Sequence, residues 1–268
     1  MRSALDYEAY IFDLDGTVYL GQELIPGADT AIQSLRQSGR KTMFISNKPI
    51  ETRAAYAEKL TRLGIPTSEE WVLNSSLALA RYLSRAMPCA RTYVIGETPL
   101  IEDLIVAGLQ IVSDPLEAEV VVLSWDRDFG YRKLSDALTA ALNDARLVAT
   151  NPDVSCPVAG GGYLPDCGAI AAAVEACSGR QVELFAGKPH RLLADIALQC
   201  LEVRADQCLM VGDRPETDVV FGHNAGMGTA LVLTGAGRLT PLAQAPVQPD
   251  FVLQSIAELT VGEPSPLV

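Results

Sequence analysis

Short, continuous apolar runs recur along the chain, and each of them stops abruptly at a polar residue or a glycine. Four of these runs are residues 9–12, 42–45, 208–211 and 229–233. Strands that are apolar along their whole length suit a sheet with helices on both faces, because neither face then meets water. Between the runs, Tyr56, Leu60 and Leu63 fall on one helical face. The alternation predicts an α/β fold built on a parallel sheet.

The middle of the chain repeats this alternation of apolar runs and helical patterns. Its apolar runs are residues 93–95, 120–123 and 146–149. We therefore predict a second α/β domain inserted at residues 80–180, with a core domain formed by residues 1–79 and 181–268. A chain of 268 residues buries about 70–75% of its unfolded surface, so it needs no disulfide or metal to fold. Ser255 to Glu258 is similar to a capping box that opens a last helix, and residues 262–268 are predicted to fray.

The charge balance of the chain restricts its partners. It holds 21 Lys and Arg residues against 33 Asp and Glu residues, which is a formal net charge of −12. Binding to nucleic acid needs clustered cations that displace counterions from phosphates, so no nucleic-acid partner is expected. A small anionic substrate is compatible with this charge, because a bound cation can invert the field at one site.

Cysteine usage and hydropathy indicate an intracellular location. The six cysteines contain no Cys-x-x-Cys pair and the only histidines are His190 and His223, so a zinc site of ordinary spacing is not expected. Scattered cysteines of this kind are typical of reduced, mostly buried thiols in the cytosol. The N-terminus has no apolar signal core and no apolar stretch approaches 18 residues. We therefore expect a cytoplasmic protein with no membrane partner.

Polar residues stand directly after three of the predicted strands. Asp13 and Ser46 each follow an apolar run, and Asp213 follows another after one glycine. Ligands of open α/β sheets bind beyond the carboxyl ends of the strands, so we expect these side chains to converge although they lie 33 and 167 residues apart in sequence. Each residue alone is more typical of a helix cap or a turn, whereas the three together indicate a binding site.

The segment DLDGT at residues 13–17 is the sharpest local signal. Residues two apart in an extended chain point to the same side, so the carboxylates of Asp13 and Asp15 can face one site. Gly16 permits a tight turn that brings backbone amides close to a ligand. A divalent cation would relieve the repulsion between the carboxylates. An EF-hand calcium loop is excluded, since Gly and Glu are missing from the sixth and twelfth positions counted from Asp13.

Lys188 is a candidate cation for a phosphate, because a lysine just ahead of a predicted helix is a suitable point charge. The segment is not a P-loop, since Pro189 stands where Ser or Thr is required and no glycine lies five residues before Gly187. The glycine pairs at residues 226–228 and 235–237 lack the strand–turn–helix order of a dinucleotide site, so no nucleotide cofactor is expected.

Taken together, these residues resemble, in order, the four motifs of the haloacid dehalogenase superfamily. The motifs are residues 13–17 (DLDGT), Ser46-Asn47, Lys188 and residues 212–218 (GDRPETD). From about residue 9 to 260, the chain resembles the class IIA branch, which contains NagD-type, p-nitrophenyl and pyridoxal phosphate phosphatases. Supporting stretches are residues 25–28, 149–153, 167–170, 187–189 and 233–235. The resemblance implies a Rossmann-like core with a parallel sheet and an α/β cap domain inserted between the second and third motifs.

The resemblance also implies a Mg²⁺-dependent phosphatase that hydrolyses small phosphomonoesters. Asp13 would be the nucleophile that forms an aspartyl-phosphate, and Asp15 would protonate the leaving oxygen and then activate water. The metal ligands would be Asp13, the Asp15 backbone carbonyl and Asp213. The implied catalytic residues are Asp13, Asp15, Ser46 and Lys188.

The same resemblance assigns the residues that hold the phosphate. They are Asp13, Leu14, Asp15, Ser46, Asn47 and Lys188. Ser46 would donate to a phosphoryl oxygen together with the Asn47 backbone amide, and Lys188 would neutralise developing charge. Asp218 would orient Lys188 or a metal-bound water, and the alternative is a favourable charge near a helix N-terminus.

Other activities share features of this core. A dehalogenase needs neither a proton from the position of Asp15 nor a metal, so the presence of Asp15 and Asp213 favours phosphoryl chemistry. A phosphotransferase such as a phosphomutase uses the same core, but its usual helical cap is inserted soon after the first motif, and here only 28 residues separate Thr17 from Ser46. A non-catalytic phosphate-binding module would lack the nucleophile or the acid, and both are present. The mutase and the binding module stay as the alternatives.

The cap of this branch contacts the leaving group of the substrate. The candidates here are Trp125, Asp126, Arg127, Asn151 and Asp153, together with residues 160–163. Arg127 would meet a second anionic group or form a surface ion pair, and Trp125 would stack on a ring or pack the cap. The branch acts on sugar phosphates, nucleotides, pyridoxal phosphate and aryl phosphates, and no residue here selects one of them. Cap-mediated dimers in similar proteins make a homodimer an expectation, and neither histidine receives a role.

Overall fold

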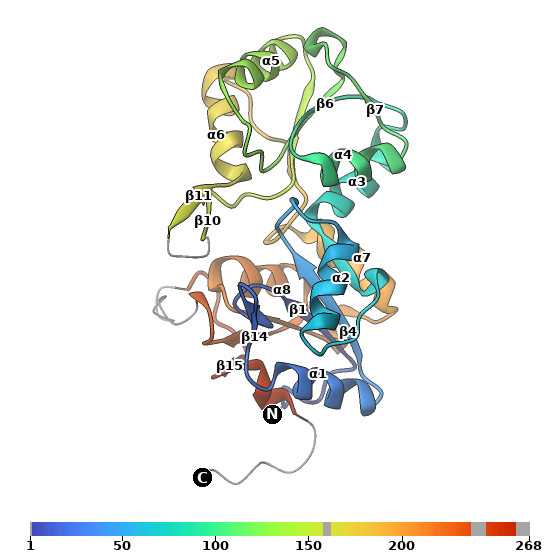
Figure 1. Ribbon diagram of the computed structural model, residues 1–268, viewed down its shortest axis with the longest axis vertical. Coiled ribbons are helices and arrows are strands. Elements are labelled where there is room, and N and C mark those ends of the chain that lie inside the picture. Colours follow the sequence, from blue (N-terminus) through green and yellow to red (C-terminus); the bar gives the residue numbers. More distant parts are fainter. Residues whose placement is uncertain (1, 158–161, 237–244, 261–268) are drawn as a thin grey trace. The chain divides into compact units, whose positions relative to one another are not determined.

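The computed structural model describes residues 2–157, 162–236 and 245–260, which fold into two compact α/β units (Figure 1). The first unit takes its described residues from Met1–Ile45, Arg53–Leu73 and Ala194–Val268, and the second from Ser46–Thr52 and Asn74–Leu193. The second unit contains the described part of residues 80–180 and extends beyond it at both ends. Residues 160 and 161 of the predicted cap loop, and the predicted frayed tail at 262–268, lie outside the described residues.

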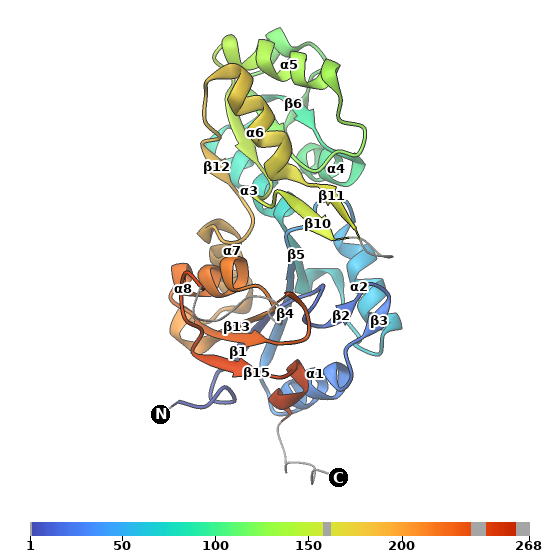
Figure 2. The same ribbon diagram turned by 90° about the vertical axis from the view of Figure 1, so that its left-hand side faces the viewer.

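The first unit is built on a six-stranded sheet with the order β15-β14-β13-β1-β4-β5 (Figure 2). Its strands are β1 (Ala9–Asp13), β4 (Lys41–Ser46), β5 (Val72–Asn74), β13 (Cys208–Gly212), β14 (Gly228–Val232) and β15 (Phe251–Leu253). β1 pairs in parallel with β4 and β13, and β13, β14 and β15 pair in parallel in turn. The first four residues of β1 are fully buried, because both faces of this central strand are covered.

Helices cover both faces of this sheet. They are α1 (Ala28–Gln37), α2 (Arg53–Arg62), α7 (Arg191–Leu201) and α8 (Val220–Ala225), with the single turns η1 (Glu69–Trp71), η3 (Ala205–Gln207), η4 (Pro215–Val219) and η7 (Ile256–Leu259). Figure 2 shows α1 and α2 on one side of the sheet and α7 and α8 on the other. On the α1 side, the rings of Tyr10, Phe12 and Phe44 follow one another with centroids 6.2 and 6.0 Å apart. This aromatic row anchors β1 and β4 side by side.

The register of the parallel strands decides where the chain leaves the sheet. Phe12 of β1 lies opposite Val211 of β13, and Asp13 lies opposite Ile45 of β4. Asp13 and Asp213 therefore emerge at the same edge of the sheet, at the carboxyl ends of adjacent strands. A short antiparallel hairpin, β2 (Tyr19–Leu20) with β3 (Glu23–Leu24), follows the turn after β1.

The second unit has its own parallel sheet, with the order β12-β9-β8-β6-β7. Its elements are α3 (Ser75–Ala86), β6 (Arg91–Ile95), α4 (Thr98–Val106), β7 (Gln110–Ile111), η2 (Pro115–Glu117), β8 (Val120–Leu123), α5 (Tyr131–Leu142), β9 (Arg146–Ala149), β10 (Ser155–Pro157), β11 (Tyr163–Pro165), α6 (Cys167–Ser178) and β12 (Leu184–Phe185). Figure 1 shows α3 and α4 on one side of this sheet and α5 and α6 on the other. In neither unit is a described helix both long enough and apolar enough to cross a membrane.

The last helix differs from the prediction. Residues Ile256–Leu259 form one turn of 3₁₀-helix, and Ser255 Oγ accepts the Ala257 N–H at 3.2 Å as a cap. Glu258 Oε1 accepts the N–H of Gln254 instead of that of Ser255, so the reciprocal capping box is not formed. A single 3₁₀ turn is wound more tightly than an α-helix, which changes the backbone amide that the glutamate reaches.

Candidate active site

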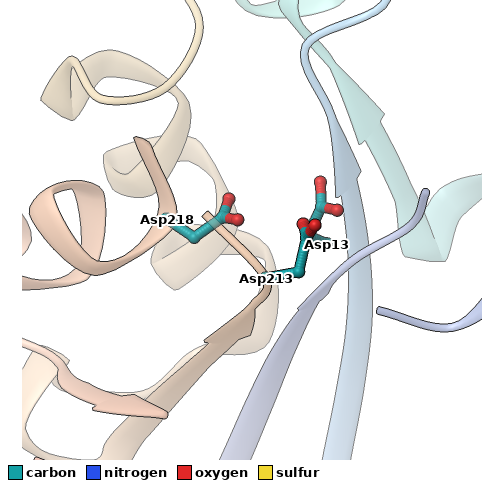
Figure 3. Close-up of side chains that lie close together, drawn as sticks. All are labelled: Asp13, Asp213 and Asp218. Atoms are coloured by element: carbon teal, nitrogen blue, oxygen red, sulfur yellow. The ribbon is translucent and has the colours of Figure 1, made fainter. Parts of the chain in front are cut away.

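Three carboxylates converge in the first unit, at the carboxyl edge of its sheet. Asp13 is the last residue of β1, Asp213 follows β13 directly, and Asp218 belongs to the turn η4. One oxygen from each residue lies within 4.8 Å of the other two (Figure 3). Asp213 and Asp218 are buried, at 3% and 1% exposure. Like charges packed this closely repel one another unless a cation or a proton compensates, so the cluster is suited to a metal ion.

Two glycines make room for the Asp213 carboxylate. A Cβ atom on Gly16 would lie 2.4 Å from Asp213 Oδ2, and a Cβ atom on Gly235 would lie 2.1 Å from the same oxygen. Gly16 also has a φ angle of +98°, which residues with a side chain rarely adopt. The Ala236 N–H donates to Asp213 Oδ2 at 2.6 Å. The carboxylate therefore sits in a cradle that a larger residue at either glycine would fill.

The loop after β14 completes this cradle, although it contains none of the predicted site residues. Thr234 Oγ1 donates to the Gly16 carbonyl at 2.6 Å, which ties the loop to the turn after β1. A signal for this loop exists in the sequence. The apolar run at residues 229–233 stops at Thr234-Gly235, in the same way that the other core runs stop at predicted site residues.

Asp218 is fixed by the turn to which it belongs. Its Oδ2 accepts the Arg214 N–H at 3.0 Å, and its own N–H donates to the Arg214 carbonyl at 2.8 Å. A Cβ atom on Gly212 would lie 2.3 Å from Asp218 Cγ, so the carboxyl group packs directly on the end of β13. Asp218 thus caps its own turn and also joins the carboxylates of Asp13 and Asp213.

The donor set of the cluster fits Mg²⁺. This ion prefers oxygen ligands, usually one or two carboxylates completed by water and substrate phosphate. The cluster offers only carboxylate oxygens, and no His or Cys among the described residues joins it, which disfavours softer metals. The cradle around Asp213 adds to the fit, because it holds one potential ligand oxygen at a defined place.

The turn after β1 carries the predicted acid–base residue, Asp15. Asp15 forms an isolated bridge with Tyr19, and its carboxylate is not part of the three-carboxylate cluster. The buried Leu14 holds the turn closed, because its carbonyl accepts the N–H groups of Val18 at 2.9 Å and Tyr19 at 3.2 Å. The predicted metal ligand of Asp15 is its backbone carbonyl, and the position of the side-chain carboxylate does not test that prediction.

In the second unit, other predicted residues gather around Asn47. The Asn47 Nδ2 donates to Asp153 Oδ2 at 2.8 Å and to the Lys188 carbonyl at 2.9 Å, while its Oδ1 accepts the Lys188 N–H at 2.7 Å. Both backbone polar groups of Lys188 are therefore bonded to one amide side chain. A Cβ atom on Gly187 would lie 2.5 Å from Asn47 Oδ1, so glycine before the lysine lets the amide approach. Lys188 itself is 3% exposed.

Asn151 and Asp153, which are predicted substrate contacts, support Asn47. The Asn151 Nδ2 donates to the Asn47 carbonyl at 3.1 Å, and its Oδ1 accepts the Asp153 N–H at 3.0 Å. Ser75 Oγ donates to the same carbonyl at 2.7 Å. Ser46, the last residue of β4, is 5% exposed, and its Oγ accepts a backbone N–H two residues on. These bonds hold the segment after β4 against the loop after β9.

The other cap candidates are engaged within the second unit. Trp125 is 4% exposed, and the buried Asp126 forms an ion pair with Lys133 at 2.5 Å. Arg127 forms a bidentate ion pair with Glu97, with N···O distances of 2.7 and 2.6 Å, and this guanidinium lowers the pKa of Glu97. Of the two arrangements considered for Arg127, the structure contains the surface ion pair.

The two histidines lie outside both groups. His190 precedes α7 and stacks on Phe185 with ring centroids 5.5 Å apart, and burial lowers its pKa. His223 is exposed on α8. Neither position suggests a role in the chemistry of the carboxylate cluster.

Asp166 gives a prediction on stability. Burial raises the pKa of this carboxyl to about 6, and its Oδ1 caps α6 by accepting the Cys167 N–H at 2.6 Å. A raised pKa means that the folded protein binds this proton more tightly than the unfolded chain, so the stabilising contribution present at pH 4 is lost as the pH rises through 6. We expect Asp166→Asn, which keeps the cap, to become more stable relative to the wild type by on the order of 2 kcal/mol between pH 4 and 7.

Urea unfolding at several pH values, followed by circular dichroism, measures this difference. Asp114→Asn is the matched control, since Asp114 also caps a helical turn, by accepting the Leu116 N–H, but is exposed. A stability difference between Asp166→Asn and the wild type that does not change with pH would contradict the buried, proton-binding carboxyl.

Comparisons with known proteins agree with these observations. A family model described as haloacid dehalogenase-like hydrolase matches residues 10–110, and a second, HAD-like hydrolase model matches residues 185–259. The chain is 38% identical over 250 residues to the sugar-phosphatase AraL of Bacillus subtilis, covering 93% of this chain and 91% of that protein. The solved structure of p-nitrophenyl phosphatase from Archaeoglobus fulgidus matches with a TM-score of 0.89 and 33% identity, over 95% of this chain and 98% of that one. NagD from E. coli K-12 matches with a TM-score of 0.86 and 29% identity, over 94% and 98%.

The chain belongs to the haloacid dehalogenase superfamily, in its class IIA or NagD-type branch. It is a phosphoric monoester hydrolase. The predicted family, the α/β fold class with a Rossmann-like core and the enzyme class are thereby confirmed.

Proposed function

We propose that this phosphatase is Mg²⁺-dependent and hydrolyses small phosphomonoesters through an aspartyl-phosphate on Asp13. The observation that carries the proposal is the cluster of Asp13, Asp213 and Asp218 at the carboxyl ends of β1 and β13. Mg²⁺ held there would offset the repulsion between a carboxylate nucleophile and a dianionic ester. Its proposed ligands are Asp13, the Asp15 backbone carbonyl and Asp213, with Asp218 supporting them directly or through water.

The chemistry of the chain's own residues follows from this assignment. An Asp13 carboxylate oxygen forms a bond to phosphorus while the bond from phosphorus to the alcohol oxygen breaks. Asp15 gives its proton to that leaving oxygen, and the resulting carboxylate then takes a proton from the water that attacks the phosphorus. Hydrolysis frees phosphate and restores Asp13. Ser46, Lys188 and the backbone amides of Leu14 and Asn47 are proposed to bind the phosphoryl oxygens.

The substrates proposed for the enzyme are sugar phosphates, nucleotides, pyridoxal phosphate or aryl phosphates. The named relatives, a sugar phosphatase and a p-nitrophenyl phosphatase, support a small ester of this kind. The second unit is proposed to act as the cap, with Trp125, Asp126 and the loop at 151–153 on the side of the leaving group. A cytoplasmic location is supported by six cysteines of which none forms a disulfide. The proposed homodimer is measurable by analytical ultracentrifugation.

Metal dependence is the first test of this proposal. Phosphate release would be measured with Mg²⁺ on a panel of sugar phosphates, nucleotides, pyridoxal phosphate and p-nitrophenyl phosphate. We expect chelation by EDTA to abolish turnover and added Mg²⁺ to restore it, because the carboxylate cluster then regains its counter-charge. Ca²⁺ is the matched control ion, since it is larger and accepts a looser coordination. Full activity after exhaustive chelation would contradict the proposal, and the ranking of substrates would identify the preferred ester.

Asn47 provides a second test, aimed at Lys188. Replacing Asn47 with Ala removes three hydrogen bonds, two of which hold the backbone of Lys188. We expect kcat/KM to fall about ten-fold or more, because each lost bond in a buried network leaves a polar group unsatisfied and the lysine less well placed. The loss should appear for every substrate in the panel, since the phosphoryl group is common to all of them.

The control for this variant is Asn143→Ala. Asn143 lies in the same unit and gives one exposed hydrogen bond to the Leu116 carbonyl, so its removal should leave kcat/KM unchanged. Thermal unfolding of both variants separates a loss of positioning from a loss of fold. A folded Asn47→Ala protein with wild-type kcat/KM would show that the amide does not position the lysine.

A further inference from the structure

A group of positively charged residues lies in the first unit, away from the carboxylate cluster. It surrounds a cavity of about 330 Å³, which we call the basic cavity. The residues that line it are Arg36, Arg40, Lys41, Thr42, Pro66, Thr67, Ser68 and Trp71. Three of these eight are cations and none is a carboxylate, in a chain whose net charge is −12. Carboxylates lie at the edge of the cavity, since Ser68 Oγ donates to Glu70 Oε1 at 3.0 Å, but none of them lines it.

Arg36 is held rigidly at the wall of the basic cavity. Its Nε donates to Thr42 Oγ1 at 2.8 Å, its Nη1 donates to the Pro66 carbonyl at 2.6 Å, and its guanidinium lies 5.8 Å from the centroid of the Phe44 ring. Both acceptors are neutral, and burial lowers the pKa of this guanidinium. Within the described chain, Nη2 makes no hydrogen bond, so one edge of a fixed, partly desolvated cation is left for a ligand.

Arg40 and Lys41 are likewise bonded to neutral groups. Arg40 donates to Ser38 Oγ at 2.6 Å and to the Leu5 carbonyl at 2.8 Å, and its Nε is buried with no partner among the described residues. Lys41 Nζ donates to the Leu201 carbonyl at 2.5 Å. Both residues also line a neighbouring cavity that contains Asp6, Glu8 and Glu202, yet neither forms an ion pair within 4.0 Å in the part of the chain described.

We infer that the basic cavity binds a small molecule that carries a phosphoryl group. Two arginines, Arg36 and Arg40, line the cavity, and planar guanidinium groups are suited to the oxygens of a phosphoryl dianion. Lys41 points to the other face of the sheet, where its Nζ bonds the Leu201 carbonyl at the end of α7. The volume is at the lower end of the range for small-molecule sites, which admits phosphate or a small phosphate ester. Trp71 and Pro66 also line the cavity and offer apolar surface for an organic group attached to the phosphate.

This binding site is separate from the carboxylate cluster. Thr42 is the second residue of β4, whereas Ile45, which lies opposite Asp13, is near the end of the same strand. The two sites therefore lie toward opposite ends of the sheet of the first unit. A phosphatase continually meets phosphate esters and releases phosphate, so ligands of this chemistry are present wherever the enzyme works. The inference does not depend on the mechanism proposed for Asp13.

The two tryptophans of the chain make the basic cavity accessible to a direct test. They are Trp71, which lines the cavity, and Trp125, which is buried in the second unit, so Trp125→Phe leaves Trp71 as the sole tryptophan. In this background, inorganic phosphate or phenylphosphonate would be titrated in the presence of EDTA while the tryptophan fluorescence is recorded. A titration with chloride at equal ionic strength is the reference. We expect saturable quenching or enhancement by phosphate or phenylphosphonate and none by chloride. A tighter response to phenylphosphonate indicates an organic ligand, and an equal one indicates inorganic phosphate.

Variants then assign the signal to the cavity. We expect Arg36→Met and Arg40→Met to weaken binding about ten-fold or more, because each removes a charge-assisted contact. Arg204→Met, which removes an exposed arginine elsewhere in the first unit, should leave the affinity unchanged, and so should Lys188→Met in the proposed active site. Should Arg36→Met not fold, Arg40→Met carries the test.

Three results would overturn the inference. These are the absence of saturable phosphate binding, an equal loss of affinity in Arg204→Met, and loss of the signal in Lys188→Met. The last result would place the phosphate in the active site, and it would support the proposed function at the expense of the second site. Phosphate binding at Trp71 in an enzyme that shows no metal-dependent turnover would contradict the proposed function and support the second site. The two proposals can therefore fail independently.

Discussion

Replacing Asp13 with Asn is expected to lower phosphate release about a thousand-fold or more, because a neutral amide is not a nucleophile toward phosphorus. The same substitution is expected to raise the thermal stability of the metal-free protein. Asp13 contributes one of three carboxylates within 4.8 Å of one another, and removing one charge relieves their repulsion. An Asn side chain has nearly the same shape, so packing should be unaffected. The prediction therefore combines a large loss of activity with an increased melting temperature of the metal-free protein.

Activity assays in Mg²⁺ and thermal unfolding in EDTA measure the two halves of this prediction. Glu102→Gln is the matched control, since it makes the same change from acid to amide at an exposed position of α4. It should leave both quantities unchanged. Turnover retained by Asp13→Asn would remove Asp13 as the nucleophile, and a lower melting temperature in EDTA would mean that the cluster is not electrostatically strained.

Gly235→Ala is expected to have the second largest effect, although glycine 235 carries no functional group. A Cβ atom there would lie 2.1 Å from Asp213 Oδ2 and 2.8 Å from Gly16 Cα, distances at which something must move. Because Asp213 is a proposed metal ligand, its displacement should raise the Mg²⁺ concentration needed for half-maximal activity and lower kcat/KM about a hundred-fold. Overpacking should also lower the free energy of unfolding by roughly 1–3 kcal/mol.

Gly130→Ala is the matched control for this substitution. Gly130 has an extended backbone with φ of −158°, and an added Cβ would meet no heavy atom within 4 Å. Activity, its Mg²⁺ dependence and urea unfolding should all stay at wild-type values in that variant. A Gly235→Ala protein with the Mg²⁺ dependence of the wild type would show that the cradle around Asp213 does not serve the metal.

The strands and the residues at their ends follow from local sequence. The apolar run at 9–12 is typical of a strand enclosed on both faces, and the structure contains that strand with the chain turning after it. Asp13 and Asp213 were predicted to converge for this reason, and the parallel register brings them to one edge. The last helix was less predictable, because the choice between an α-helix and a 3₁₀ turn depends on a few weak hydrogen bonds.

Other features depend on contacts between distant segments. Asn47 was predicted to act through its backbone amide, whereas its side chain bonds Lys188 and Asp153, which lie 141 and 106 residues away in sequence. Arg127 was open between a substrate contact and an ion pair, and its partner Glu97 lies 30 residues earlier. Hydrophobic periodicity and short sequence motifs do not predict such side-chain pairs, because the pairs depend on how neighbouring loops pack.

The sequence by itself determined the α/β class, the family and the carboxylates at the strand ends, because apolar strands, tight turns and ordered motifs are properties of neighbouring residues. The tertiary structure alone decided that Gly235 must be a glycine, that Asp218 joins the carboxylates of Asp13 and Asp213, and that Arg36 and Arg40 line one cavity. Each of these depends on atoms brought within a few ångströms by folding, and steric exclusion and electrostatic repulsion act only at such distances.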